Sequence, residues 1–259
     1  MAKRAPTPNW RAWLARWDEQ QESFNPSRER RFDAMFDVLA AALPRRFTAL
    51  DLGCGPGSLT ARLLRRFPAA RVVAVDFDPV VLQVGRGALS GLGDRITWVD
   101  ANLGAPGWTM SLPRRRFDAA VSTTALHWLR RPELRRLYRD LAPLIRPRGV
   151  VLNGDYLPWG AQRPRLGRLA ERARRNAFGG KSLQSEWAGW NRWWRDIEKE
   201  AALQDEFVLR KERFPTPHGS SRDSPVPLEF HLRALRRAGF RDVDVVWQEM
   251  ENRVLVGFR

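Results

Sequence analysis

One short segment constrains the fold of this chain more than any other. From Ala49 to Gly57 the sequence reads Ala-Leu-Asp-Leu-Gly-Cys-Gly-Pro-Gly, so an apolar strand leads into an acid and then into three alternating glycines. A helix is predicted directly afterwards, from Ser58 to Phe67, because its leucines recur on one helical face. Glycines between a buried strand and a helix allow a sharp turn and leave no Cβ between the backbone and a ligand. The segment therefore predicts a site for a nucleotide-type cofactor.

Two families of cofactor enzyme share this order of strand, glycine loop and helix. A dinucleotide-binding fingerprint requires a third glycine where this sequence has Ser58, and an acid at Asp51 is atypical of that fingerprint. The pattern instead resembles the first motif of the class I S-adenosylmethionine (SAM) dependent methyltransferases, whose glycine loop faces the methionine half of SAM. The resemblance assigns cofactor contacts to Asp51, Gly53, Cys54 and Gly55.

The next two predicted strands also end in acids. Val72 to Val75 form a continuous apolar run before Asp76, and Ile96 to Val99 precede Asp100. One such acid alone is explained equally well as a solvated loop carboxylate or a helix cap, but acids at three successive strand ends favour a SAM site. There a carboxylate can accept hydrogen bonds from the ribose hydroxyls or the adenine amino group. The expected adenosine contacts are Asp76, Phe77, Asp100, Ala101 and Asn102.

Later segments complete the sheet that the resemblance implies. A fourth and a fifth strand are predicted at Phe117 to Ser122 and Gly149 to Asn153. The helix from Leu228 to Ala238 precedes two more strands, Val243 to Trp247 and Arg253 to Phe258. Class I methyltransferases end in such a hairpin, with the seventh strand antiparallel between the fifth and the sixth. We therefore expect an α/β fold with a seven-stranded, mostly parallel, doubly wound sheet and an antiparallel last strand.

The chain is expected to form a single methyltransferase domain over residues 1–259. Its hydrophobic content of 43% suffices for one core, and nothing suggests two independent domains. The expected parts are a helical N-terminal cap at 1–46, a SAM-binding core at 47–155, an inserted helical lid at 156–226, and a final helix and hairpin at 227–259. Cys54 is the only cysteine, and no apolar segment has signal or membrane-spanning length, so we expect a cytoplasmic protein without a membrane span.

Arginine dominates the charge of the chain. The formal net charge is +16, and lysine occurs only at positions 3, 181, 199 and 211. So many cations attract polyanions. Three interpretations stay open: a solvated surface from an arginine-rich coding bias, attraction of an acidic substrate or partner, and nucleic-acid binding. The first is favoured, because most of the dense clusters fall on predicted helix faces or loop tips.

The sequence after the fourth strand tests the nucleic-acid alternative. Enzymes that methylate base amino groups usually carry Asp or Asn, then Pro-Pro and an aromatic residue there, whereas this chain continues Ser122-Thr123-Thr124. Cytosine C5 enzymes need a cysteine nucleophile at this position, and Cys54 lies elsewhere. The first class is therefore disfavoured and the second excluded, while RNA enzymes that recognise shape stay open. By position, Ser122 and Thr123 are predicted cofactor contacts.

His127 is the candidate catalytic residue. The segment from Ala125 to Trp128 is similar to one in trans-aconitate methyltransferase-like small-molecule enzymes, and it follows the strand end where the transferred methyl group should lie. Methyl transfer from a sulfonium requires mainly alignment of the nucleophile and removal of its proton, which a histidine can perform. Three roles stay open for His127: a general base, a hydrogen bonder that positions the substrate, and a structural residue.

Tryptophan is concentrated outside the predicted core. Eight of the 12 tryptophans lie before the first strand or between the fifth strand and the last helix. They recur at helical spacing, as in Trp10, Trp13, Leu14 and Trp17 and in Leu183, Trp187, Trp190, Trp194 and Ile197. We expect these stripes to form an aromatic two-part lid over the SAM site, with Arg11, Arg16, Arg192 and Glu198 outside. Plain core packing and a membrane-interfacial helix are the alternatives.

The remaining site residues follow from position. The expected substrate contacts are Trp17, Trp128, Asp155, Tyr156, Trp187 and Trp190. By resemblance, Arg31 is expected to pair with the SAM carboxylate, although Arg28 and Arg30 are equally available. His218 and His231 are expected on the surface or on a helix face, Phe214 to Pro227 are expected to form an exposed connector, and no spacing of His, Cys or acids suggests a metal.

These features predict a SAM-dependent methyltransferase with a small-molecule acceptor, which receives the methyl group on a hydroxyl or carboxylate oxygen and leaves S-adenosylhomocysteine (SAH). Nucleic acid is not the expected partner. The rival functions are an RNA methyltransferase and a SAM-binding regulatory protein without catalysis. Two indications about the acceptor conflict: an aromatic lid favours an apolar or aromatic compound, whereas the resemblance and the arginine excess favour a carboxylate.

Overall fold

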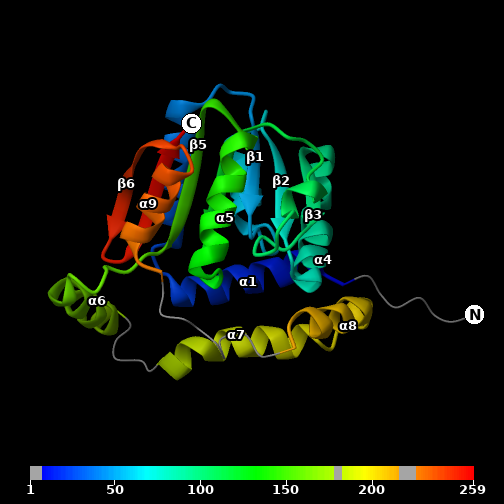
Figure 1. Cartoon of the computed structure of the whole chain (residues 1–259). Helices are drawn as coiled ribbons and strands as arrows, with labels where there is room; N and C mark the ends of the chain where they lie inside the picture. Colours follow the sequence, from blue (N-terminus) through cyan, green and yellow to red (C-terminus); the bar gives the residue numbers. More distant parts are fainter. Residues whose placement is uncertain (1–7, 178–182, 216–225) are drawn as a thin grey trace, which may run out of the picture.

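The computed structural model describes residues 8–177, 183–215 and 226–259. Within them seven strands form one sheet in the order β3-β2-β1-β4-β5-β7-β6 (Figure 1). All neighbours pair in parallel except β7, which runs antiparallel to both β5 and β6. The predicted fold class is thus confirmed, including the place of the last strand. The strands are β1 (Thr48–Leu52), β2 (Arg71–Asp76), β3 (Ile96–Asp100), β4 (Phe117–Thr123), β5 (Ile145–Tyr156), β6 (Arg241–Glu249) and β7 (Asn252–Phe258).

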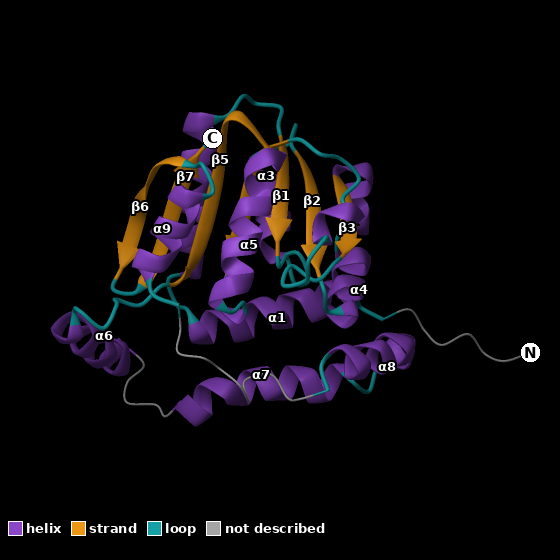
Figure 2. Cartoon of the chain, in the orientation of Figure 1, coloured by secondary structure: helices purple, strands orange, loops and turns teal. Residues whose placement is uncertain are grey.

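Helices cover both faces of the sheet (Figure 2). Neighbouring strand residues point to opposite faces, so Ala49 packs in the cluster with α2 and α3, whereas Leu50 packs in the cluster with α5 and α9. Each face therefore has its own apolar core, and the strands are buried on both sides. The helices are α1 (Trp10–Phe24), α2 (Arg28–Ala42), α3 (Ser58–Arg66), α4 (Pro79–Ala88), α5 (Arg131–Leu141), α6 (Pro164–Ala177), α7 (Leu183–Ile197), α8 (Gln204–Arg213) and α9 (Leu228–Arg237).

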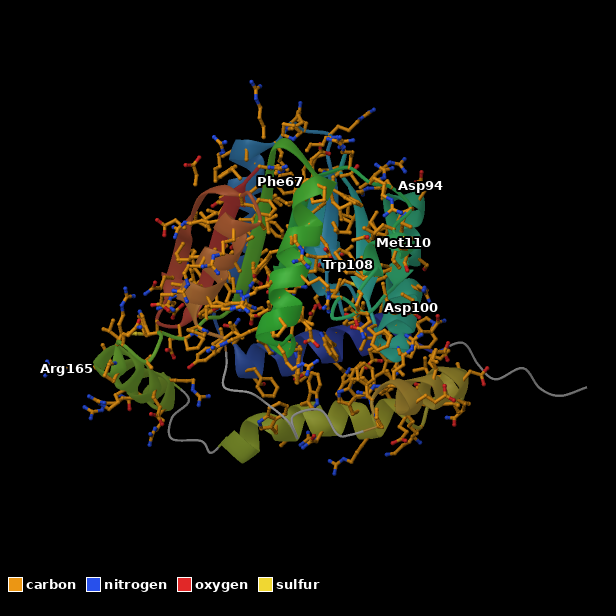
Figure 3. The ribbon with its side chains drawn as sticks, viewed as in Figure 1. Phe67, Asp94, Asp100, Trp108, Met110 and Arg165 are labelled. Carbon is orange, nitrogen blue, oxygen red and sulfur yellow. The ribbon has the colours of Figure 1, made fainter. Side chains whose placement is uncertain are left out.

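The parallel register brings the functional strand ends to one edge. Leu52 of β1 pairs with Val75 of β2, and Asp76 of β2 pairs with Asp100 of β3. Figure 3 shows Asp100 at this carboxyl edge and Phe67 at the opposite one. Residues that are far apart in the sequence therefore lie side by side where a ligand can reach them.

Three helices lie beneath the carboxyl edge. In Figure 1, α1, α7 and α8 run below the strand ends. Trp13 of α1 and Trp193 of α7 are buried in a third apolar cluster with Val81 and Val84 of α4. The rings of the two tryptophans meet edge to face at 6.0 Å. This cluster attaches α1 and α7, which are far apart in the sequence, to each other and to the core.

Local differences from the sequence predictions have simple causes. Helix α5 begins at Arg131, where Pro132 lies in its first turn and Glu133 accepts the backbone N–H of Arg130. His231 is buried rather than on the surface, and its Nδ1 lies 2.7 Å from the hydroxyl oxygen of Tyr138. Burial lowers the pKa of His231 to about 4. Most of the expected connector between Phe214 and Pro227, including His218, lies outside the described residues.

Candidate active site

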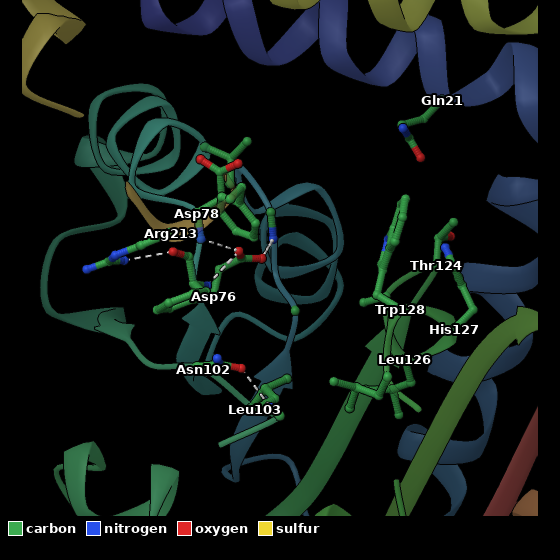
Figure 4. A pocket seen from close by; sticks show the side chains of 18 of the residues that line it. Gln21, Asp76, Asp78, Asn102, Leu103, Thr124, Leu126, His127, Trp128 and Arg213 are labelled. Carbon is green, nitrogen blue, oxygen red and sulfur yellow. Dashed lines mark hydrogen bonds between the residues drawn. The ribbon is translucent and has the colours of Figure 1, made fainter. Parts of the chain in front are cut away.

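A cavity of about 620 Å³ lies at the carboxyl edge of the sheet. Figure 4 shows Asp76, Asn102 and Arg213 on one side of it and Gln21, His127 and Trp128 on the other. The lining comes from the glycine loop, from the segments after β2, β3 and β4, and from α1, α7 and the end of α8. The segments after the strand ends and the added helices thus enclose the cavity together.

The glycine loop approaches the segment after β4 without intervening side chains. Gly53 has a φ of +69° and Gly55 a φ of +54°, conformations that only glycine adopts without strain. A Cβ on Gly53 would lie 2.4 Å from the Cβ of Ala125. Both glycines line the cavity, whereas the neighbouring Cys54 is buried and its thiol meets the carbonyl oxygen of Gly55 at 3.4 Å. The loop therefore requires glycine for its own geometry as well as for a ligand.

Asp76 connects the end of β2 to this loop. Its Oδ2 accepts the N–H of Gly55 at 2.7 Å, and its Oδ1 accepts those of Phe77 and Asp78 at 2.7 and 2.9 Å. Burial raises the pKa of Asp76 to about 6, although the backbone donors oppose this shift. The side chain lines the cavity, and its oxygens have remaining lone pairs that ribose hydroxyls can use.

Asp51 lies deeper, behind the loop. It is almost fully buried, and its Oδ2 accepts a hydrogen bond from the Thr60 hydroxyl at 2.6 Å. Burial raises the pKa of Asp51 to about 7. Its Oδ1 has no hydrogen-bond partner among the described residues, and an unpaired buried oxygen is costly. The predicted contact of Asp51 with SAM stays a prediction, because Asp51 does not line the cavity.

Two aromatic rings lie at the side of the cavity next to β2 and β3. Phe77, after β2, and Phe214, after α8, both line the cavity, with ring centroids 5.6 Å apart and planes at 67°. Ala101 and Asn102, directly after β3, also line it. These residues can hold an adenine ring between apolar surfaces and backbone polar groups. Phe214 was not predicted from the sequence, because it lies in the insert, far from the strand ends.

Asp100 is paired with an arginine of the insert. Arg213 of α8 donates to its two carboxylate oxygens at 2.7 and 2.9 Å, and also to the carbonyl of Phe77 at 2.7 Å. One helical turn earlier, Arg210 donates to the Oδ2 of Asp78 at 2.6 Å. These bonds attach α8 to the ends of β2 and β3. The predicted contact of Asp100 with adenine stays a prediction.

His127 lines the cavity and is held from behind by Asp155. The Nδ1 of His127 lies 2.8 Å from the Oδ1 of Asp155. The backbone N–H of His127 donates to the Oδ2 of Asp155 at 3.2 Å. Burial alone would raise the pKa of Asp155, but His127 and Arg31 outweigh it and hold that pKa below the ordinary value. An ionised acceptor at Nδ1 selects the tautomer that leaves Nε2 as a proton acceptor. Asp155 is therefore placed to position His127, and it does not line the cavity as expected of a substrate contact.

Arg31 is buried beneath the site. It donates to the hydroxyl of Thr123 at 2.8 Å, to that of Thr124, and to the side-chain oxygen of Asn252 at 3.0 Å. Burial lowers its pKa to about 10, against the opposing effect of Asp155. Thr124 lines the cavity at a φ of +52°, so Arg31 supports a strained turn in the wall. Its predicted bond to the SAM carboxylate stays a prediction, because Arg31 does not itself line the cavity.

The tryptophans divide into two groups. Trp17, Trp187, Trp190 and Trp194 line the cavity, whereas Trp13, Trp193 and Trp10 pack with α4 and do not line it; Trp17 and Trp194 also pack on that apolar cluster. The lid interpretation and the core-packing interpretation thus each describe one group. Arg16, expected on the outside, pairs with Asp196 of α7 and lies over the Trp13 ring at 4.4 Å. The side chain of Leu183 lies outside the described part of the chain.

Several predicted site residues do not line the cavity. The hydroxyl of Ser122 donates to the carbonyl of Leu52 at 2.8 Å and connects β4 to β1. Tyr156 donates its hydroxyl to Glu251 in the turn between β6 and β7, away from the cavity. The predicted residues outside the lining are Asp51, Cys54, Asp100, Ser122, Thr123, Arg31, Asp155 and Tyr156. The predicted residues within it are Gly53, Gly55, Asp76, Phe77, Ala101, Asn102, His127, Trp17, Trp128, Trp187 and Trp190.

Sequence inspection missed Gln21, Phe24, Arg213 and Phe214 in the lining. Gln21 and Phe24 lie four and seven residues after Trp17, so helical spacing alone could have placed them on the same face. Within the described ranges, no group of three or more His, Cys, Asp or Glu side chains could hold a metal ion. A search of the same residues finds no helix that is long and apolar enough to cross a membrane.

Comparisons with known proteins agree with this geometry. The sequence profile of a family described as "Methyltransferase domain" matches residues 49–149. A trans-aconitate 2-methyltransferase of Azoarcus sp. (strain BH72) is 36% identical over 136 residues, which cover 52% of this chain and 49% of that protein. The chain thus spans about half the length of that curated relative.

Solved structures share the fold. An O-methyltransferase family protein from Burkholderia thailandensis superimposes with a TM-score of 0.56 at 21% identity, covering 95% of this chain and 59% of that one. Human N-acetylserotonin methyltransferase in complex with SAM gives a TM-score of 0.51 at 14% identity, with 98% and 60% covered. The glycine loop, the strand-end residues and these matches agree on one assignment. Residues 49–149 match a methyltransferase domain, and the chain has the fold of the class I SAM-dependent methyltransferases.

Proposed function

We propose that this chain transfers the methyl group of SAM to an oxygen atom of a small-molecule acceptor, with His127 as the general base. The observation that carries the proposal is the pair of His127 in the cavity wall and the fully buried Asp155 behind it, 2.8 Å apart. A histidine oriented by a carboxylate is a recurrent arrangement for taking a proton from a hydroxyl group. The division of residues 1–259 into cap, core, lid and hairpin is part of the same proposal.

The residues of the chain have separable tasks in this mechanism. SAM, when bound, supplies a methyl group that is already activated on a sulfonium. Gly53, Gly55, Asp76 and Phe77 would hold it. Asp155 keeps the Nδ1–H of His127 as a donor, so Nε2 accepts the proton of the acceptor hydroxyl. Thr124 and Ala125 keep the base close to the glycine loop, since Ala125 lies directly beside Gly53.

Labelled SAM, incubated with the purified chain and a fractionated metabolite extract, tests the function. We expect label in a small-molecule fraction. Label that is found in the RNA fraction and is released from it by ribonuclease would instead indicate an RNA methyltransferase. If calorimetry shows that the chain binds SAH but no fraction takes up label, the chain is a non-catalytic SAM-binding protein.

Variants of His127 separate the three roles that stay open for it. If it is a base, His127→Ala and His127→Gln both lower kcat by about 10² to 10⁴ while SAH affinity is unchanged. If it only positions the substrate, the glutamine variant recovers most of the rate because it retains a hydrogen-bonding amide. A fall in melting temperature that accounts for the lost activity would mark a structural residue.

A further inference from the structure

The cavity has a second half that the cofactor residues do not use. Asp76 and Asn102 lie on one side, and Gln21, His127 and Trp128 face them across the space (Figure 4). If the first side holds SAM, as the proposed function requires, the second side is left for the acceptor. The chemistry of this second side therefore indicates what kind of acceptor it fits.

Aromatic rings form most of the acceptor side. Trp17 of α1 lies 5.3 Å from Trp190 of α7, and Phe24 lies 5.3 Å from Trp187. Trp187 and Trp190 meet each other at 6.2 Å, nearly at right angles. Rings set at these angles present both faces and edges to the cavity, which suits a flat aromatic ligand. We define the aromatic wall as Trp17, Phe24, Trp128, Trp187 and Trp190.

The cavity does not offer a free cation among the residues that the structure describes. Among the lining residues in the described part of the chain, only Arg213 is an arginine or lysine, and it is bonded to Asp100 and to the carbonyl of Phe77. Three lining residues are acids: Asp76, Asp78 and Glu133. A compound with two or three carboxylates would lose its hydration there without an ion-pair partner. The arginine excess of the chain therefore does not favour a carboxylate at this site.

Polar groups on the acceptor side are few. Gln21 and Thr124 can each make hydrogen bonds, and His127 can accept one proton. This set matches one or two hydroxyl groups on an apolar body. It does not match a dense array of negative charges.

The part of the chain that matches the methyltransferase family profile does not contain this wall in full. The family profile ends at residue 149 and begins at residue 49, so α1 and α7 both lie outside it. The relative named trans-aconitate 2-methyltransferase covers 52% of this chain. The substrate named for that relative therefore does not by itself identify the acceptor of this chain.

We propose that the acceptor is a planar aromatic compound with a phenolic hydroxyl and without a cluster of carboxylates. Its ring lies against the aromatic wall and its hydroxyl faces His127. The phenolic oxygen forms the new bond to the methyl carbon, the bond from that carbon to sulfur breaks with its electron pair left on sulfur, and the phenolic proton passes to His127. This inference rests on the proposed function and specifies its substrate class.

A direct competition tests the substrate class. The intact chain is given SAM with equal concentrations of 1-naphthol and trans-aconitate, and products are separated by mass. We expect the methyl ether of 1-naphthol and no methyl ester of trans-aconitate. Preferred methylation of trans-aconitate would overturn the inference while leaving methyl transfer, the proposed function, established.

Calorimetry with SAH present gives a readout that does not need turnover. We expect 1-naphthol to bind to the unaltered chain. Trp190→Ala should weaken that binding at least tenfold, and Trp190→Phe should bring it back to within about threefold of the unaltered chain. The affinity for SAH should be unchanged in both variants. Trp159→Phe is the matched control, because Trp159 packs on Arg253 outside the cavity. Absence of 1-naphthol binding, or binding that ignores Trp190→Ala, overturns the inference. Binding that depends on Trp190 without any methyl transfer supports the inference and counts against the proposed function.

Discussion

The two sides of the cavity are built in different ways. The donor side consists of strand ends, where Gly53, Gly55 and Asp76 are held by the sheet and by backbone hydrogen bonds. The acceptor side consists largely of side chains from α1 and α7, such as Trp17 and Trp190, whose helices lie at distant places in the sequence. Backbone geometry thus limits the residue types that the donor side can carry. On the acceptor side, replacing one aromatic side chain is enough to change the shape of the wall. The following variants test whether the two sides are separable, beginning with the largest expected effect.

Gly53→Ala should disrupt the donor side most strongly. The positive φ and the 2.4 Å approach to Ala125 leave no room for a methyl group. We expect SAH affinity to fall by roughly 10³, since backbone strain and the clash together cost several kcal/mol. Calorimetry measures the affinity. Gly167→Ala in α6 is the matched control, because a Cβ there meets nothing within 4 Å; SAH binding that survives Gly53→Ala would contradict this account.

Asp155→Asn should lower the rate of transfer without affecting the donor side. The amide cannot supply the ionised acceptor that selects the tautomer of His127. We expect kcat to fall by roughly 10² and SAH affinity to stay within about twofold. A steady-state assay with the identified acceptor, over a range of pH, measures both the rate and its profile. Equal rates for the two proteins at every pH would show that Asp155 does not position the base.

Arg213→Gln tests the bonds that join the insert to the donor side. The variant removes the two contacts to Asp100, which is partly exposed, so solvent screens part of the loss. We expect SAH affinity to fall by about tenfold, as α8 and Phe214 lose their place beside Phe77. Lys211→Gln removes a charge from the exposed face of the same helix and should leave the affinity unchanged. Identical affinities for both variants would mean that α8 does not support the cofactor side.

The pH dependence of SAH binding should show the smallest effect. Since burial raises the pKa of Asp76 to about 6, this carboxyl takes up a proton as the pH falls through that value. The ionised form is the one that accepts hydrogen bonds from a ribose, so affinity should fall as the pH falls. Between pH 7.5 and 5.5 we expect about a fourfold loss, from the change in the ionised fraction. The Asp76→Asn variant should bind SAH more weakly, and its SAH affinity should change less with pH. Any pH dependence that remains would be assigned to Asp51, whose pKa is about 7.

The donor side was predictable because its residues follow strand ends in order. An apolar run that ends in an acid specifies both the strand and the edge at which the acid lies, as for Asp76 and Asp100. Sequence alone could not show that Asp100 is bonded to Arg213, because that contact joins residues 113 positions apart. Likewise Asp155 and Tyr156 follow the expected strand, yet β5 continues through both residues beside β7, and their side chains bond to His127 and Glu251 without lining the cavity.

The acceptor side was only partly predictable. Helical spacing placed Trp17 and Trp190 on faces that are covered, but it could not distinguish a cavity lining from packing against α4. Trp193 and Trp194 are neighbours in the sequence, and only the first is buried against Trp13 while the second lines the cavity. That difference depends on how α7 is rotated over α1, which is set by contacts such as Trp13 to Glu200 at 2.8 Å. Such tertiary contacts leave no periodic signal.

The position of Asp18 limits how independently the two sides can evolve. Asp18 follows Trp17 directly in α1, and it accepts hydrogen bonds from Ser58 at 2.6 Å, from Arg28 at 2.8 Å and from Arg62 at 2.9 Å. Ser58 is the first residue of the helix that follows the glycine loop. A mutation that shifts α1 to admit a different acceptor therefore also pulls on the loop that faces the cofactor. Helix α7, which contributes Trp187 and Trp190, packs mainly on α1, so a change of acceptor that acts through α7 reaches the glycine loop less directly.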